Sequence, residues 1–248
     1  MDETLDRLAS AIRRADSTVA LTGAGVSTAS GIPDFRGESG IWGTRFDPAD
    51  FRIGRFRSDP AGFWTDRLDL HEAMFPGEVE PNPAHEALAE LESAGRLDAV
   101  ITQNTDGLHQ RAGSERVLEL HGNARRVVCM DCERKSDAAP VRERVRDGER
   151  PPRCECGGLL KPDVVLFGES LPEAILADAR RRASESDVFL AIGSSLSVEP
   201  AASLPRAASR RGTLAILNLD PTPHDSLAAV VVRADVTEAL PALVERLS

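Results

Sequence analysis

Apolar positions along the chain follow two patterns, and each predicts one kind of secondary structure. Leu5, Leu8, Ala9 and Ile12 recur at the spacing of one helix face, which predicts a helix over residues 3–15. Short uninterrupted apolar runs are typical of buried strands. They predict strands at residues 18–22, 98–102, 163–167, 188–192, 213–219 and 229–232. Further helices are predicted at residues 83–95, 172–184, 199–210 and 236–247.

The alternation of apolar runs with helical stretches predicts the fold class. We expect an α/β protein with a Rossmann-like, doubly wound parallel sheet that carries helices on both faces. In such a sheet, ligands bind beyond the carboxyl ends of the strands. Residues that directly follow the predicted strands are therefore the first candidates for a functional site.

Two regions interrupt this alternation. Residues 36–80 are rich in aromatic side chains and contain no clear strand, and residues 125–160 carry all four cysteines together with many charges. We interpret both as insertions that build a smaller helical and zinc-binding domain. The predicted domains are residues 1–36, 81–124 and 161–248 for the Rossmann-like domain, and residues 37–80 and 125–160 for the smaller one.

Composition narrows the set of partners. The 248 residues carry a formal net charge of −10, which disfavours a general nucleic-acid or membrane-surface binder because such proteins need a basic face. No segment has the roughly 18 consecutive apolar residues of a membrane helix, and the first residues lack the apolar core of a signal peptide. We expect a cytoplasmic protein, and a monomer, without a direct nucleic-acid or membrane partner.

The first predicted strand leads into a glycine-containing loop. Gly23, Ala24 and Gly25 follow it directly, and glycines there permit a tight turn and a close approach of the backbone to a pyrophosphate. Ser27 would add a hydroxyl contact. A dehydrogenase fingerprint needs a third glycine at position 28, where this chain has Thr28. The loop alone is also compatible with an ordinary tight turn.

A polar cluster and a histidine follow later strands. Gln103, Asn104 and Asp106 come directly after the predicted strand at 98–102, and an amide and a carboxylate two residues apart can hold a carboxamide and a ribose hydroxyl. The alternative is a polar loop with an Asx turn. His121 follows another apolar run, and a neutral imidazole suits a general base near neutral pH. A lone histidine is also compatible with a structural role.

The four cysteines form two close pairs. Cys129 and Cys132 are separated by two residues, and Cys154 and Cys156 by one. In a reducing compartment, clustered cysteines indicate metal binding rather than disulfides. Four thiolates would complete the tetrahedral coordination of one structural Zn²⁺. Free buried thiols are the alternative, and the short spacing of the second pair leaves open whether all four sulfurs are ligands.

Taken in order, these motifs resemble one family, the sirtuins, which are NAD-dependent protein deacylases. The matching segments are TGAGVSTASGIPDFRG, TQNTDGLH, LHG, the cysteine pairs, LLKPDVVLFGE, GSSLSVEP and LNLD, and they extend from about residue 18 to residue 220. The resemblance implies an NAD-dependent protein lysine deacetylase that transfers the acetyl group from lysine to ADP-ribose and releases nicotinamide.

The resemblance also implies a role for each matching residue. NAD would contact Gly23, Ala24, Gly25, Ser27, Ile32, Asp34, Phe35, Arg36, Gln103, Asn104, Asp106, His121, Gly193, Ser194, Ser195, Asn218, Leu219, Asp220 and Val236. His121, Asn104 and Asp106 would be the catalytic residues, and Phe35 would shield the reacting ribose carbon from water. An acetyl-lysine peptide would bind as an added strand between two segments, against Val165, Phe167, Gly168, Glu169, Ser197 and Val198.

The implied reaction begins when the amide oxygen of acyl-lysine attacks the ribose carbon that carries nicotinamide. His121 then acts as general base on a ribose hydroxyl, which takes over the acyl group. Two departures from the family pattern bear on this site. Thr105 replaces an isoleucine in the nicotinamide pocket. The chain also has no tyrosine, so the Tyr-x-x-Arg signature for acidic acyl groups is absent and acetyl is the expected group.

Other functions remain compatible with the same cofactor site. ADP-ribose transfer or NAD hydrolysis would use the same residues without an acetyl-lysine peptide. A non-catalytic sensor of NAD or ADP-ribose would need no base, so His121, Asn104 and Asp106 argue against it. A plain dehydrogenase ranks third, because the stretch from Pro33 to Arg36 is not part of its fingerprint.

Overall fold

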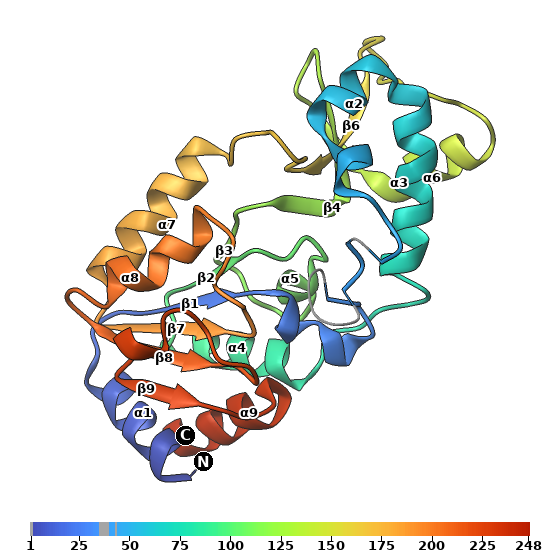
Figure 1. The fold of residues 1–248 in the computed structure, drawn as a ribbon. Coiled ribbons are helices and arrows are strands. Elements are labelled where there is room, and N and C mark those ends of the chain that lie inside the picture. The colour runs from blue at the N-terminus through green and yellow to red at the C-terminus, as the bar shows by residue number, and fades with distance from the viewer. Residues whose placement is uncertain (1, 35–39, 43) are drawn as a thin grey trace.

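The computed structural model describes residues 2–34, 40–42 and 44–248, and Figure 1 shows two layered regions joined near the middle of the molecule. The larger region contains a six-stranded sheet, and the smaller one contains a three-stranded sheet. Among the residues that the structure describes, no helix is long and apolar enough to cross a membrane.

The six-stranded sheet is parallel and has the order β3-β2-β1-β7-β8-β9. Its strands are β1 (Thr18–Thr22), β2 (Ala99–Thr102), β3 (Val117–Glu119), β7 (Val188–Ile192), β8 (Thr213–Leu217) and β9 (Val230–Val232). Every residue of β1, β2 and β7 is buried, as expected for strands covered on both faces. The chain runs outward in opposite directions from β1 and β7, which makes this pair the switch point of the sheet.

Helices cover both faces of this sheet, as the alternation of patterns predicted. On one face α1 (Asp2–Arg14), α4 (Pro83–Ser93) and α9 (Val236–Leu247) share a core with Ala20 and Leu190. On the other face α7 (Glu173–Glu185) and α8 (Leu204–Ala208) share a core with Leu21 and Phe189. Neighbouring strand residues therefore enter different cores, and the predicted doubly wound α/β fold is confirmed (Figure 1).

The three-stranded sheet is antiparallel and has the order β5-β4-β6. Its strands are β4 (Gly122–Cys129), β5 (Lys135–Asp137) and β6 (Leu160–Val164), and it packs with α2 (Ile53–Ser58), α3 (Pro60–Met74) and α6 (Ala138–Arg146). Trp64 anchors this packing, because its buried indole N–H donates to the Leu160 carbonyl at 2.9 Å.

One predicted strand lies in a different sheet from the one expected. The apolar run at residues 163–167 was assigned to the parallel sheet, but the strand is β6 at residues 160–164 and it pairs with β4. A short apolar run does not reveal its partner, and β6 is an edge strand that tolerates Pro162. The predicted domain boundaries place this segment with the larger domain, and those boundaries stay a prediction.

Candidate functional site

Three loops meet beyond the carboxyl ends of β1, β2 and β7. The amide of Gly23 donates to the Ile192 carbonyl at 3.0 Å, and the amide of Gly25 donates to the Gly193 carbonyl at 2.8 Å. The Gln103 side-chain amide donates to Ser194 Oγ at 2.9 Å. The predicted glycine loop, polar cluster and serine loop are therefore brought together at the switch point of the sheet.

The two loop glycines are needed where the first and third loops touch. A Cβ at Gly23 would lie 2.7 Å from the Ser194 Cβ, and a Cβ at Gly25 would lie 2.9 Å from the Gly193 carbonyl oxygen. Gly193 itself has a φ of +57°, a conformation that favours glycine. These glycines thus allow two protein loops to approach closely, a reason that the sequence analysis did not include.

Asn104 and Asp106 are buried and joined through Ser27. The Asn104 side-chain amide donates to the Gly23 carbonyl at 3.0 Å and to Ser27 Oγ at 3.1 Å. The Ser27 hydroxyl in turn donates to Asp106 Oδ2 at 2.8 Å. Each of the three residues is at most 5% exposed, so their positions are set by the protein before any ligand binds.

The carboxylate of Asp106 is influenced by opposing effects. Burial raises its pKa above the usual range, and this is the largest effect; hydrogen bonds from the Leu108 amide and the Ser27 hydroxyl act in the lowering direction. The backbone carbonyl of Asp106 also accepts from Arg125 Nε at 2.6 Å. The loop is thereby attached to β4 of the smaller sheet.

The buried side chain of His85 contacts the hydroxyl of Ser27. His85 Nδ1 accepts from the Asn82 amide at 3.3 Å, so the ring hydrogen lies on Nε2, which is 3.4 Å from Ser27 Oγ. His85 is fully buried, and burial lowers its pKa to about 4. The neutral ring is therefore a donor to the oxygen that links Asn104 with Asp106.

A second buried histidine supports Asn104 through two threonines. The Thr22 hydroxyl donates to Thr102 Oγ1 at 2.8 Å. Thr102 Oγ1 also accepts a hydrogen bond from the backbone N–H of Asn104 at 3.0 Å. Thr22 Oγ1 therefore accepts from His109 Nε2, 2.9 Å away. Burial, with His85 adding to it, lowers the pKa of His109 to about 3. The sequence gives no local sign of this network, because its members come together only in the folded chain.

His121 lies two residues after β3 and directly before β4. Its Nδ1 is 2.9 Å from the Gln103 carbonyl oxygen. A carbonyl only accepts, so Nδ1 carries the hydrogen of the neutral ring and Nε2 carries the lone pair. Gly122 has a φ of +75°, and a Cβ there would lie 2.1 Å from the Asp163 carbonyl oxygen. Glycine at this position lets β4 pass close to β6 immediately after His121.

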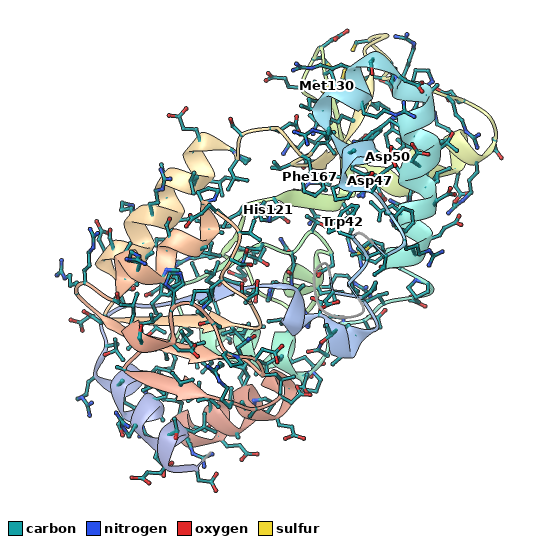
Figure 2. The ribbon with its side chains drawn as sticks, in the orientation of Figure 1. Trp42, Asp47, Asp50, His121, Met130 and Phe167 are labelled. Carbon is teal, nitrogen blue, oxygen red and sulfur yellow. The ribbon has the colours of Figure 1, made fainter. Side chains whose placement is uncertain are left out.

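The segment after β6 connects His121 with the smaller region. The Val165 amide donates to the His121 carbonyl at 2.9 Å, while Phe167 exchanges backbone hydrogen bonds with Phe51 and Ile53. Trp42 packs edge-on against Phe167, with ring centroids 5.4 Å apart. Figure 2 shows His121, Trp42 and Phe167 in the region between the two sheets.

A buried ion pair closes the turn that contains Gly168. Lys161 is 7% exposed, and its Nζ donates to Glu169 Oε2 at 2.9 Å and to the Val164 carbonyl at 2.7 Å. The same carboxylate oxygen accepts the Leu166 amide at 2.8 Å. The side chain of Glu169, predicted to contact a peptide, is thus bound within the protein, whereas the backbone at Gly168 is exposed.

A small pocket opens beside Asn104 and Asp106. Its lining comes from the glycine loop, from the end of α3 and from the polar cluster, and consists of Ala24, Ser27, Ile32, Pro33, Met74, Phe75, Asn104, Thr105 and Asp106. Five predicted cofactor residues are therefore neighbours here. Asp34 is partly buried next to this pocket. The predictions for Phe35 and Arg36 fall outside the described residues.

The residues predicted to hold the adenosine half are at the ends of β7 and β8. Ser195 Oγ lies 2.8 Å from Ser197 Oγ, and both residues are exposed, while Val198 is partly buried. Asn218 Nδ2 donates to the Asp220 carbonyl at 2.8 Å, and Leu219 between them is 66% exposed. Ser194 and Val236 are both buried, and Val236 packs in the core that α1, α4 and α9 share.

The four cysteines form one cluster at the end of the smaller sheet. Their sulfur atoms all lie within 4.8 Å of one another, and the Cys129–Cys156 and Cys132–Cys154 sulfur distances are 3.5 and 3.8 Å. A tetrahedral zinc ion with Zn–S bonds of about 2.3 Å would place its sulfurs about 3.8 Å apart. The cluster therefore fits one closed, structural zinc ion, and the CxC pair supplies two of the four sulfurs.

The surroundings of the cysteines favour the thiolate at two positions and disfavour it at a third. Backbone hydrogen bonds lower the pKa of Cys129, and a backbone hydrogen bond together with one from Arg134 lowers the pKa of Cys154 to about 6. A backbone hydrogen bond from Gly158 acts in the lowering direction at Cys156, but the neighbouring sulfurs of Cys132 and Cys129 raise its pKa to about 12. Gly158 lies so close that a Cβ on it would be 2.7 Å from the Cys129 sulfur. The second glycine after the CxC pair is therefore part of the cluster's packing.

Comparison with known proteins gives consistent matches. The model of the Sir2 family matches residues 23–200. Proteins named NAD-dependent protein deacetylase from Haloarcula marismortui and NAD-dependent protein deacetylase 1 from Pyrobaculum aerophilum are 60% and 49% identical, each over 99% of this chain and 95% of the relative.

Solved structures match over nearly the whole chain as well. A Sir2 structure with a p53 peptide and NAD⁺ has a TM-score of 0.85 and 40% identity, covering 96% of each chain. A Sir2 structure with a deacetylated p53 peptide and 3′-O-acetyl ADP-ribose has a TM-score of 0.88 and 40% identity, covering 97% of each chain.

Proposed function

This chain belongs to the Sir2 family, and on that basis we propose that it is an NAD-dependent protein deacetylase. It transfers the acetyl group from a lysine side chain to ADP-ribose and releases nicotinamide. Relatives with this name and Sir2 structures with NAD⁺, peptide and acetylated ADP-ribose support the activity. Bound NAD would supply the ribose that accepts the acetyl group.

The observation that carries this proposal is that the ring of His121 is bound to the carbonyl of Gln103, the residue before the buried Asn104. Nδ1 is held by the Gln103 carbonyl, so Nε2 is the atom that can take a proton. We assign the base role to Nε2 of His121. Asn104 and Asp106, already oriented by Ser27, bind the nicotinamide end of the cofactor.

The donor set fits the cofactor. Buried amide and carboxylate groups line the pocket at the switch point, where a dinucleotide binds in folds of this kind. We propose that the loop of Gly23, Ala24 and Gly25 holds the pyrophosphate, and that the adenosine half lies along Gly193, Ser194, Ser195, Asn218, Leu219 and Asp220. We keep Val236, at the start of α9, as a further predicted contact of this half.

The acetyl-lysine peptide would bind between the two predicted domains. We propose that it adds a strand between the backbone at Gly168 and Glu169 and the backbone at Ser197 and Val198, because backbone pairing demands little of the peptide sequence. Exposure of Gly168 and Ser197 supports this. Val165 and Phe167 then flank the lysine side chain, close to His121.

Two further features complete the proposal. One zinc ion held by Cys129, Cys132, Cys154 and Cys156 stabilises the smaller domain without taking part in the reaction. We also propose a cytoplasmic location, which the four free cysteines support because such thiols persist in reducing compartments.

The deciding experiment is incubation of the protein with NAD and an acetyl-lysine peptide, followed by mass spectrometry. We expect acetylated ADP-ribose, nicotinamide and free-lysine peptide in equal amounts. A parallel reaction without peptide, or with the unacetylated peptide, is the control. Nicotinamide release that is independent of acetyl-lysine would favour ADP-ribose transfer or NAD hydrolysis instead, and tight NAD binding without any turnover would favour a sensor.

A further inference from the structure

A second pocket lies within the smaller region, away from the residues assigned to NAD and peptide. Its walls come from α3, α6 and the sheet strands β4 and β6, elements that Figure 1 shows grouped at one end of the molecule. The lining residues include Arg67, His71 and Arg142 on two helices, and Trp64 and Leu68 as apolar walls.

The two arginines of this pocket differ from others in the same region. Arg146 pairs with Glu143 and Glu72, and Arg144 pairs with Glu149 at 2.5 Å. For Arg67 and Arg142, by contrast, the structure shows neither a hydrogen bond nor an ion pair with any residue it describes. Two guanidinium groups thus line one pocket without a protein partner.

Partial burial of both arginines makes this arrangement costly. Desolvation and the positive charge of Arg142 lower the pKa of Arg67 to about 10, so the group still carries its charge at neutral pH. Burial is also the largest effect that lowers the pKa of Arg142, although Asp137 and Glu143 act from farther away in the opposite direction. Unpaired charges removed from water destabilise a fold, and proteins normally pair them.

His71 adds a neutral hydrogen-bonding group to the same pocket. Burial and the surrounding arginines lower its pKa to about 3, so the ring is uncharged at neutral pH. A neutral imidazole can donate one N–H to an acceptor. Together the three side chains present donors and positive charge, and none of them presents a negative charge.

We propose that this pocket binds a small oxyanion, either phosphate or a carboxylate, between Arg67 and Arg142. Planar guanidinium groups match such anions through paired N–H donors, and the apolar walls strengthen the interaction by limiting contact with water. The pocket is small and open to solvent on one side, which limits its occupant to a small anion that both side chains can reach from the opening. This inference does not depend on the proposed deacetylase activity.

The test measures thermal unfolding of the full chain in potassium phosphate, potassium acetate and potassium chloride at equal ionic strength. We expect phosphate or acetate to raise the melting temperature in a saturable way beyond chloride. In the double variant Arg67→Gln and Arg142→Gln, this saturable rise should be lost, with at least tenfold weaker apparent binding. Without added oxyanion, the variant should melt no lower than wild type, because it lacks two unpaired, partly buried charges.

The matched control is the double variant Arg57→Gln and Arg210→Gln, which removes two exposed arginines for which the structure shows no partner among its described residues. This control variant should keep the full saturable rise in melting temperature with phosphate or acetate. A phosphate response that persists after loss of Arg67 and Arg142 would place the anion elsewhere, for example at the cofactor loop, and would overturn the proposal. So would equal responses to all three salts.

A second measurement follows the wild-type protein and does not require the double arginine variant to fold. The ring signals of His71 in wild-type protein, assigned with His71→Asn, are followed by NMR as phosphate or acetate is added. We expect saturable shifts, and a pKa of His71 that rises when an anion occupies the pocket. Unchanged His71 signals across the concentration range of the thermal response would refute the site.

Discussion

The two sheets are held together by different means. β1, β2 and β7 are buried along their whole length between two apolar cores. β5 is exposed along its whole length. The smaller sheet packs on an apolar core through β4 and β6, and it also has side-chain links such as Arg126 with Asp163 at 2.9 Å and the four-cysteine cluster. Both regions therefore have an apolar core, but the smaller one adds charged pairs and a cysteine cluster that fits a metal ion.

The candidate base lies where these two kinds of structure meet. β3 of the larger sheet ends two residues before His121, and β4 of the smaller sheet begins one residue after it. The His121 ring is held by the larger region through Gln103, and its backbone carbonyl accepts from Val165 in the segment after β6. Substitutions in either region should therefore affect the position of His121, through Gln103 in the larger region or through Val165 in the segment after β6.

Removal of zinc should give the largest difference between the two regions. Structural zinc contributes about 10–16 kcal/mol in small zinc-dependent peptides, and the cluster lies at the end of the smaller sheet. After chelation, we expect fast amide exchange in residues 125–160, with protection retained in β7 and β8. Metal analysis should find about one zinc per chain before chelation. Unchanged exchange in residues 125–160 of zinc-free protein would contradict this view.

The variant His121→Ala tests the junction itself. We expect deacetylation to fall by about 10²–10⁴-fold, the usual contribution of a general base, while NAD binding measured by calorimetry is retained. Neither sheet loses packing, so the melting temperature should stay close to that of wild type. Near-normal turnover would remove His121 from the base role.

The variant Lys161→Met tests the clamp near the proposed peptide strand. It leaves the carboxylate of the partly buried Glu169 without its cation, and we expect a loss of roughly 1–3 kcal/mol in stability with a higher KM for the peptide. Lys135→Met is the matched control, because Lys135 is 55% exposed in its pair with Asp163 and such pairs contribute about 1 kcal/mol or less. Equal effects of the two variants on KM would refute a positioning role for Lys161.

Acid should lower the free energy of unfolding through the two buried histidines of the larger region, His85 and His109. The pKa values of His85 and His109 are lowered to about 4 and 3, so the unfolded chain binds protons first as pH falls below about 6.5. Stability is complete above that pH and declines by about 1.4 kcal/mol per pH unit for each histidine down to its folded pKa. His109→Gln should remove one such contribution from the slope of stability against pH, measured by urea unfolding. An unchanged slope would contradict the assigned burial.

The same contrast explains how much of the fold could be predicted. Strands covered on both faces leave uninterrupted apolar runs, and β1 and β7 have the bounds that the sequence indicated. β3 is only half-buried and three residues long, so its run was too short to assign as a strand with bounds. The helix α3 buries Phe63, Trp64, Leu68 and Leu70 on more than one side, which removes the one-sided pattern that identifies a helix.

The candidate site likewise contains features that could be predicted from the sequence and features that could not. Spacing alone indicated the cysteine cluster, because close pairs bring their sulfurs together by local geometry. The hydroxyl and histidine network could not be predicted, since Thr22 and Thr102 are 80 residues apart and meet only because β1 and β2 are neighbours. Likewise, no local pattern identifies Arg67 and Arg142 as lining one pocket.

The Lys161–Glu169 pair also has a consequence for how this protein can be assayed and modified. The chain contains two lysines, Lys135 and Lys161, and the second is enclosed by its own ion pair. An enzyme that frees lysine amines thus exposes a single lysine amine of its own. Reagents that label lysine would report newly freed substrate against little background, and self-acetylation of lysine could act through one accessible position, Lys135.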